Sequence, residues 1–312
     1  MLSSHLIKPT GIRKFLYYLN RDKLYIFLLL PALAYYIVFH YLPMVGIVWS
    51  FQDFRIGRGF FNSEWVGFKW FIQFAKSHYF TRLIRNTVLL NLYSLLFGFP
   101  VPIFFAITLN EIKRRGFKRF TQTVSYLPNF ISVVIVVGIL TNFLSLRTGI
   151  LNQFISNLGG QQINFWTNPK WFRTIFVSSG IWHSFGFSSI VYIAAISSVD
   201  QDLYEALEVD GGNKLRAIWH ITLPGIKSTI MILLILNLGS MFSSSVEKVI
   251  LIYSESTYET ADVIGTFVYR SALTNSAYSY ATAVGLFVSV INFILLAVVN
   301  KISKHVSEVS LW

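Results

Sequence analysis

The sequence contains no cysteine and little charge. Of its 312 residues, 13% are charged, about half of the roughly 25% that is typical of soluble globular proteins, whereas 54% are hydrophobic. The lack of cysteine excludes disulfides, thiol nucleophiles, cysteine zinc sites and iron–sulfur clusters. The low charge argues against disorder. It also argues against a nucleic-acid-binding domain despite the net charge of +12, because such a domain carries its basic residues on a charged surface. Water is therefore not expected to be the main solvent of this chain.

The common motifs of nucleotide binding and hydrolysis are also missing. No glycine is followed by lysine, which excludes a G-x-x-x-x-G-K-[ST] phosphate loop and ATP binding of that kind. Neither H-E-x-x-H nor G-x-S-x-G occurs, so the chain lacks the minimum motifs of a metalloprotease or a serine hydrolase. His183 lies in an apolar segment, where we expect a hydrogen bond within the protein rather than catalysis. The sequence predicts no catalytic residue and no metal ligand.

Six segments are apolar and long enough to cross a bilayer, which takes roughly 20 residues of helix. A soluble protein with buried helices is disfavoured because these segments have almost no charged face. The first segment follows a basic stretch, but its 26 residues exceed the roughly 7–15 apolar residues of a signal peptide, so we expect it to be retained. The sequence predicts an all-α polytopic membrane protein with six transmembrane helices, near residues 24–49, 87–109, 123–144, 174–196, 226–252 and 277–299.

The basic residues predict the orientation. The short loop from Lys113 to Arg119 has five basic residues in seven, and such loops remain on the cytoplasmic side. We expect both termini in the cytoplasm. The predicted organisation is a basic cytoplasmic N-terminal segment (1–23), a six-helix permease domain (24–300) containing a cytoplasmic coupling loop (198–225), and a cytoplasmic tail (301–312), with outside connections at 50–86, 145–173 and 253–276.

Acidic residues are almost absent from the predicted spans. Only Glu247 lies inside one, beside Lys248, and we expect this pair to mark the water interface of a span whose true end comes earlier. Proton- and sodium-coupled carriers commonly need a carboxylate near mid-membrane. The distribution of acidic residues therefore argues against an ion-coupled carrier.

The loop between the fourth and fifth spans differs from the rest of the chain, because five of the fourteen acidic residues lie between positions 200 and 210. Asp202 is predicted to cap a helix of about two turns, with Glu205 three residues later as in a capping box. Glycines at 211 and 212 would end this helix. Such a helix is too short to be stable alone in water, so it needs a partner surface. Its apolar stripe comprises Leu203, Ala206 and Leu207.

The same loop resembles the EAA motif of permease subunits of binding-protein-dependent ABC importers, E-A-A-x-x-x-G-x9-I-x-L-P. Six of the seven motif positions match: Glu205, Ala206, Gly211, Ile221, Leu223 and Pro224. Leu207 departs from the second alanine. The resemblance extends over the chain from the first span onward and includes the stretch 149–153, Trp182, Gly186 and the C-terminal third from residue 261. In these features the chain is similar to MalF-like sugar permeases of the branch that serves complex oligosaccharides and polysaccharides.

The resemblance implies a type I ABC importer fold in a bacterial cytoplasmic membrane. It implies three partners: a second homologous permease subunit, expected to form a heterodimer; a cytoplasmic ATPase dimer, which binds the ATP and Mg²⁺; and a lipid-anchored or secreted extracellular solute-binding protein. This chain itself would bind no cofactor and no nucleic acid. The residues implied in coupling to the ATPase are Asp202, Leu203, Tyr204, Glu205, Ala206, Leu207, Asp210, Gly211, Gly212, Ile221, Leu223 and Pro224.

A carbohydrate substrate agrees with the uncharged polar and aromatic residues of the spans. Candidates for the substrate path are Asn142, Trp182, Tyr192, Asn237 and Ser240, although such residues also serve helix packing. Two alternatives remain open at this point. An ion-coupled secondary sugar carrier would need no ATPase, and a polytopic membrane glycosyl- or acyltransferase would need an acid/base constellation that the sequence does not display.

Overall fold

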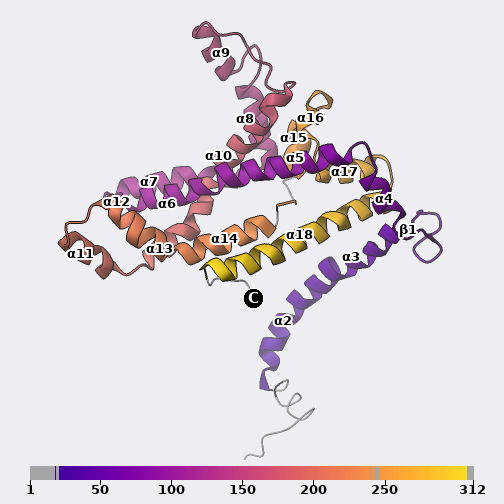
Figure 1. Ribbon diagram of the computed structural model, residues 1–312, viewed down its shortest axis with the longest axis horizontal. Helices are drawn as coiled ribbons and strands as arrows, with labels where there is room; N and C mark the ends of the chain where they lie inside the picture. Colours follow the sequence, from indigo (N-terminus) through magenta and orange to yellow (C-terminus); the bar gives the residue numbers. More distant parts are fainter. Residues whose placement is uncertain (1–17, 19–20, 240, 243–245, 308–312) are drawn as a thin grey trace, which may run out of the picture.

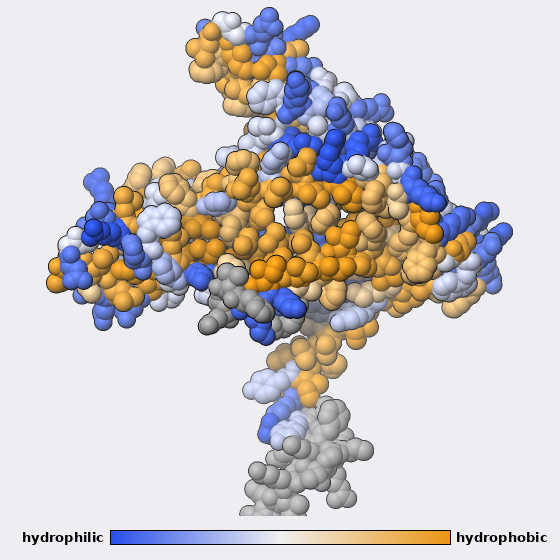
Figure 2. All heavy atoms as spheres, viewed as in Figure 1, coloured by the Kyte–Doolittle hydropathy of each residue, from blue (hydrophilic) through white to orange (hydrophobic). Residues whose placement is uncertain are grey.

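The computed structural model describes residue 18 and residues 21–239, 241–242 and 246–307. Most of its long helices run side by side, with α11 (Gln201–Val209) at one end of the molecule and α4 (Lys69–Ala75) at the opposite end (Figure 1). The visible face is hydrophobic over its middle and more hydrophilic at both of these ends (Figure 2). This distribution suits a protein whose middle lies in the hydrocarbon of a bilayer.

Four of the six predicted spans are continuous helical segments of sufficient length and hydropathy: Lys23–Phe51, Phe80–Asn110, Pro169–Ser197 and Tyr278–Lys304. Of these four segments, the last two are the single helices α10 (Pro169–Ser197) and α18 (Tyr278–Ser307). The first comprises α2 (Lys23–Tyr36), the π-helical turn η1 (Ile37–Tyr41), α3 (Leu42–Met44) and the 3₁₀ segment η2 (Val45–Phe51). The second comprises α5 (Phe80–Tyr93), the π-helical turn η3 (Ser94–Gly98) and α6 (Pro100–Asn110).

The third predicted span, 123–144, is not one straight helix. The chain forms α7 (Arg115–Tyr126) and the 3₁₀ turn η4 (Leu127–Phe130), and then turns by 101° into α8 (Val133–Phe143). Pro128 lies in the turn, and the Ser132 hydroxyl accepts a hydrogen bond from the Ile135 N–H, so that a new helix begins there. The prediction missed this break because the apolar residues continue across it.

The fifth predicted span, 226–252, is also wrong as a single helix. A helical segment made of α12 (Lys214–Ala217), the π-helical turn η5 (Ile218–Thr222) and α13 (Leu223–Gly225) bends by 60° into α14 (Lys227–Gly239). The separate helix α15 (Val246–Ile252) follows. With each bent pair counted as one span, the described residues contain up to six spans.

The end of the molecule opposite α11 is built from short elements. A two-stranded antiparallel sheet pairs β1 (Gln52–Asp53) with β2 (Glu64–Trp65), and Trp70 of α4 donates its indole N–H to the Gln52 carbonyl at 2.9 Å. The other short elements of the chain are the 3₁₀ turn η6 (Glu255–Thr257), α16 (Tyr258–Ala261), α17 (Ile264–Tyr269), the π-helical turn η7 (Arg270–Thr274) and α9 (Ile150–Asn157). Of these, α9 lies beyond α8 at the top of Figure 1.

Helix α10 is central to the packing. One core cluster joins it to α15 through Phe172, Phe176 and Val249, and a second joins it to α6 and Ile226 through Tyr192 and Ile196. At Gly186 the helix approaches α7 so closely that a Cβ atom would overlap the Ser125 carbonyl. By contrast, α2 buries none of its residues within this chain and runs away from the other helices (Figure 1).

Candidate functional site

Two short helices at one end of the molecule form the loop that the sequence singles out. The first, α11, begins after Asp200, whose carboxylate accepts a hydrogen bond from the Asp202 N–H at 3.1 Å. The predicted cap, Asp202, is therefore wrong by two residues, and the capping box with Glu205 does not form. The second helix, α12, is capped in the same way by Asn213, which accepts from the Arg216 N–H at 2.9 Å.

The glycines between these helices have distinct roles. Gly211 has a φ of +70°, a conformation that a residue with a side chain adopts only at a cost. The Gly212 N–H donates to the Leu207 carbonyl and the Gly211 N–H to the Glu208 carbonyl, which is the Schellman pattern of a helix C-terminus. A Cβ atom at Gly212 would overlap the Leu207 side chain. The glycine pair thus ends α11 as predicted and lets Leu207 pack over the turn.

One contact within this loop and one contact with the helical bundle hold the loop in place. The Tyr204 hydroxyl lies 3.0 Å from the Thr222 hydroxyl, which joins α11 to η5. The Lys214 ammonium lies 3.0 Å from the Glu111 carboxylate at the end of α6. Thr222 is buried, while Ile221 and Leu223 beside it are half-buried and Pro224 is exposed in α13. The second half of the motif therefore belongs to the anchored part of the loop.

The outer surface of α11 is acidic with exposed apolar residues. Leu203 is 52% exposed and Val209 is 87% exposed, whereas Leu207 is half-buried against the turn. The predicted stripe is therefore only partly free, and Val209, which sequence reasoning missed, is its most exposed apolar neighbour. The acidic residues on this surface are Asp202, Glu205, Glu208 and Asp210, all exposed.

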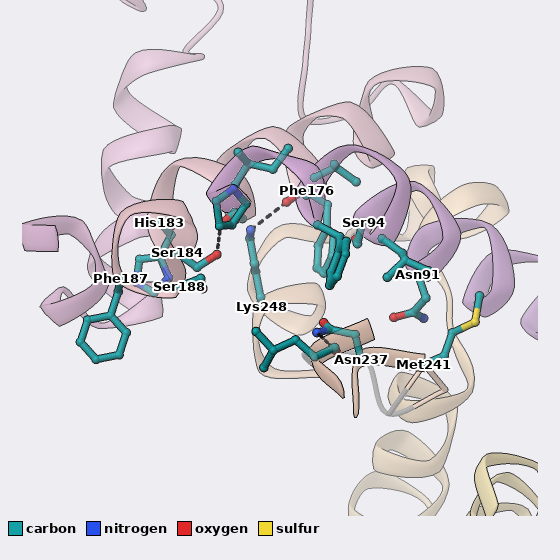
Figure 3. Close-up of a pocket in the computed structure, with 18 of the residues that line it drawn as sticks. Asn91, Ser94, Phe176, His183, Ser184, Phe187, Ser188, Asn237, Met241 and Lys248 are labelled. Atoms are coloured by element: carbon teal, nitrogen blue, oxygen red, sulfur yellow. Dashed lines mark hydrogen bonds between the residues drawn. The ribbon is translucent and has the colours of Figure 1, made fainter. Parts of the chain in front are cut away.

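A cavity of about 680 Å³ lies among α5, η3, α10, α14 and α15 (Figure 3). Its polar lining comes from asparagine, serine, histidine, tyrosine and lysine side chains, and Phe176 and Phe187 contribute aromatic surface. The hydroxyls of Ser94 and Ser184 donate to carbonyls one turn earlier, at 2.8 and 2.9 Å. Their oxygen lone pairs can still accept hydrogen bonds.

The structure brings two of the five predicted path residues to this cavity. Tyr192 and Asn237 are among its lining residues. Asn142 is exposed on α8 and donates to the Gly138 carbonyl, and Trp182 lies on another face of α10. The fifth, Ser240, lies outside the described residues.

Lys248 lines the cavity, which contradicts its expected place at the water interface. Its side chain is only 7% exposed, and its ammonium donates to the Phe176 carbonyl at 2.8 Å, whereas Glu247 is exposed. Sequence reasoning grouped the two residues because they are adjacent. In an α-helix, adjacent side chains point about 100° apart around the helix axis. This spacing is the signal that could have placed Glu247 and Lys248 in different environments.

His183 also borders the cavity. Its Nε2 lies 3.0 Å from the Ile131 carbonyl at the break between η4 and α8. This contact confirms the expected hydrogen bond within the protein. Among the described residues, no group of three or more His, Asp and Glu side chains could hold a metal ion.

Comparison with known proteins gives a consistent result over most of the chain. The chain is 44% identical to protein LplB of Bacillus subtilis over 294 residues, covering 94% of this chain and 92% of LplB. It is 40% identical to the B. subtilis polygalacturonan/rhamnogalacturonan transport system permease protein YteP, covering 97% and 94%. Its structure resembles a chain in the crystal structure of a bacterial alginate ABC transporter in complex with alginate pentasaccharide-bound periplasmic protein, with a TM-score of 0.87, 41% identity and coverage of 94% and 98%.

Residues 98–308 match the family described as binding-protein-dependent transport system inner membrane component. This match covers the cavity-lining part of α6, the α11 loop and α18. The chain belongs to this family of inner membrane components, as a multi-pass permease subunit of an ABC importer and not an enzyme.

Proposed function

We propose that this permease translocates a carbohydrate, an oligosaccharide or polysaccharide fragment, which an extracellular solute-binding protein delivers. The observation that carries this proposal is the cavity beside α10, which combines hydroxyl and amide groups with aromatic surface and has no carboxylate among the lining residues that the structure describes. Sugar hydroxyls need such hydrogen-bonding partners, and sugar ring faces pack on aromatic rings. The similar permease YteP is named for polygalacturonan/rhamnogalacturonan transport, and the similar crystal structure is that of an alginate transporter, which supports the same class of substrate.

We propose further that the chain pairs with a second permease subunit and that α11 docks on a cytoplasmic ATPase dimer, which binds ATP and Mg²⁺. Support comes from the exposed acidic and apolar surface of α11, which Tyr204 joins to η5 and which the following helix α12 ties to the end of α6 through Lys214. A helix held in this way transmits closure of the ATPase to the spans as a rigid-body movement. The remaining implied partner is the solute-binding protein, either lipid-anchored or secreted.

The proposed topology has both termini, α11 and the basic stretch from Lys113 to Arg119 on the cytoplasmic side. The ion pair between Lys214 and Glu111 supports this arrangement, because Glu111 lies two residues before the start of the basic stretch and the pair joins it to the α11 loop. The positive-inside rule then gives both loops the same side.

Reconstitution tests the proposal. Proteoliposomes containing this chain, the partner permease, the ATPase, the binding protein and ATP should accumulate oligosaccharide, and a non-hydrolysable ATP analogue should abolish this accumulation. Liposomes with this chain alone should accumulate none. Accumulation by this chain alone under a proton or sodium gradient would instead establish the secondary-carrier alternative.

Two variants test the coupling role of α11. A Cβ atom at Gly211 would meet open space, so we expect Gly211→Val to act mainly through the backbone preference, at a cost of roughly 1–2 kcal/mol. Glu205→Lys reverses a charge on the docking surface. We expect both complexes to assemble but to transport more slowly per ATP hydrolysed, while Gly211→Asn, which tolerates positive φ, retains uptake. Wild-type uptake in both variants would contradict the docking role.

A further inference from the structure

Lys248 is a buried cation on the wall of the cavity. Its ammonium lies 2.8 Å from the Phe176 carbonyl and 4.7 Å from the centroid of the Phe176 ring (Figure 3). An ammonium has three N–H donors, and the structure gives this one a single hydrogen-bond acceptor among the residues it describes. The other two donors are available to a group inside the cavity.

Among the described residues, no carboxylate pairs with this charge. The cavity-lining residues within this part of the chain include no Asp, Glu or Arg, and its five ion pairs do not include Lys248. The neighbouring Glu247 is exposed to the outside of the fold. A buried charge without a counter-ion is unfavourable, because the protein interior solvates it less well than water does. The cost is recovered when an anion enters the cavity.

The wall around the ammonium leaves space for such an anion. Gly180 lies opposite, and a Cβ atom there would lie 3.3 Å from the Lys248 Nζ. Ser184 and His183 are on the same stretch of α10 and also line the cavity (Figure 3). A ligand at this position would therefore meet a positive charge, hydroxyl groups and an aromatic ring together.

We infer that this permease selects glycans that carry an acidic group, and that Lys248 binds this group during translocation. The inference rests on the proposed carbohydrate function and adds a charge requirement to it. An ammonium binds an anionic oxygen through charge-assisted hydrogen bonds, which are stronger than those of a neutral hydroxyl. A neutral sugar would leave the ammonium uncompensated and would pass less readily.

The test compares an acidic substrate with a neutral substrate that has the same sugar backbone. One is an oligouronide, and the other is the same oligosaccharide after reduction of its carboxylates to primary alcohols. Each is presented on saturating binding protein to proteoliposomes containing the complete complex and ATP. The wild type should take up the acidic form faster. Lys248→Met should lower this preference by about tenfold, the typical weight of a charged hydrogen bond. Because the same binding protein serves every variant, its own selectivity cancels in the comparison.

Three further variants separate binding from structure. Lys248→Arg should retain the preference, since it keeps the positive charge. Gly180→Ala should reduce the preference without removing the lysine, and it provides the test should Lys248→Met fail to assemble. Lys170→Met removes an exposed lysine of the same helix α10 outside the cavity and should change nothing.

The outcomes distinguish the two proposals. Uptake of neither oligosaccharide by the wild-type complex would reject the carbohydrate function itself. Equal uptake of both, or an unchanged preference in Lys248→Met and Gly180→Ala, would overturn the role of Lys248 and leave the carbohydrate function intact. A sulfated derivative of the reduced oligosaccharide shows whether the site accepts any anion or requires a carboxylate, and Lys248-dependent uptake of either anion supports the inference.

Discussion

Asp262 holds together the end of the molecule opposite α11, and its removal is the sharpest test of the packing. Its side chain is fully buried, and both carboxylate oxygens accept from Arg270 Nη2, at 2.8 and 2.9 Å. Arg82 of α5 lies 3.2 Å away, and the Thr266 hydroxyl donates at 2.9 Å. One carboxylate therefore joins the second span to α17 and η7.

The magnitude of the effect follows from what Asp262→Ala leaves behind. Breaking a buried ion pair by removing one partner costs about 3–5 kcal/mol, because the other charge stays uncompensated. The side chains of Arg270 and Arg82 remain 24% and 32% exposed, so water can solvate them in part. We therefore expect a cost below this range, about 2–3 kcal/mol. Asp262→Asn keeps the shape of the side chain and should cost less.

The assay is thermal unfolding of the detergent-purified complex, followed by the loss of monodisperse protein. Asp262→Ala should lower the apparent Tm by several degrees. Asp53→Ala is the matched control, since Asp53 forms a surface pair with Arg55 at 3.3 Å and such pairs contribute little. The double variant Asp262→Leu/Arg270→Met should be less destabilised than the sum of its single changes. An apparent Tm for Asp262→Ala equal to that of Asp53→Ala would refute this account.

Two other predictions concern packing and topology. Gly186→Ala should separate α10 from α7, because its Cβ atom would overlap the Ser125 carbonyl, and should reduce the yield of folded complex, whereas Gly138→Ala on α8 meets open space and should be neutral. Single cysteines report the orientation without background, since the chain has none of its own. An impermeant maleimide should label a cysteine at Asn157 but not one at Phe117 in intact cells, and the opposite pattern would place α11 outside the cell.

Much of the architecture could be predicted because the determining signals are local. Uninterrupted apolar segments specify helices that can lie in hydrocarbon, and four of the six predicted spans form as continuous segments. The glycine pair at 211 and 212 ends α11 because one residue needs a positive φ, a requirement that can be recognised within a few residues. The cap was misplaced by two residues because Asp200 and Asp202 are equally suitable by type, and only the backbone conformation selects between them.

The breaks in the third and fifth spans were harder to predict. Hydropathy alone does not distinguish a straight apolar helix from two helices that meet at an angle, and apolar residues lie on both sides of the 101° bend in the third span. The 60° bend lies at the start of the fifth predicted span, and the break within that span falls between α14 and α15. The proline at 128 and the serine at 132 carried a local signal for the first break. In the structure, the Ile131 carbonyl at this break is met by His183, which lies 52 residues further along the chain. A polar group exposed by a break in a membrane helix needs such a partner, and the partner comes from the fold.

The sequence by itself determined the membrane class, the absence of a phosphate loop and the position of the exposed acidic helix, since each depends on residue types within a short window. Only the tertiary structure decided which polar residues meet. Lys248 binds a carbonyl 72 residues earlier in the chain, and Asp262 pairs with an arginine 180 residues earlier. Pairings of this kind arise when the spans pack together, because a charge withdrawn from water is stable only beside the groups that the fold brings to it.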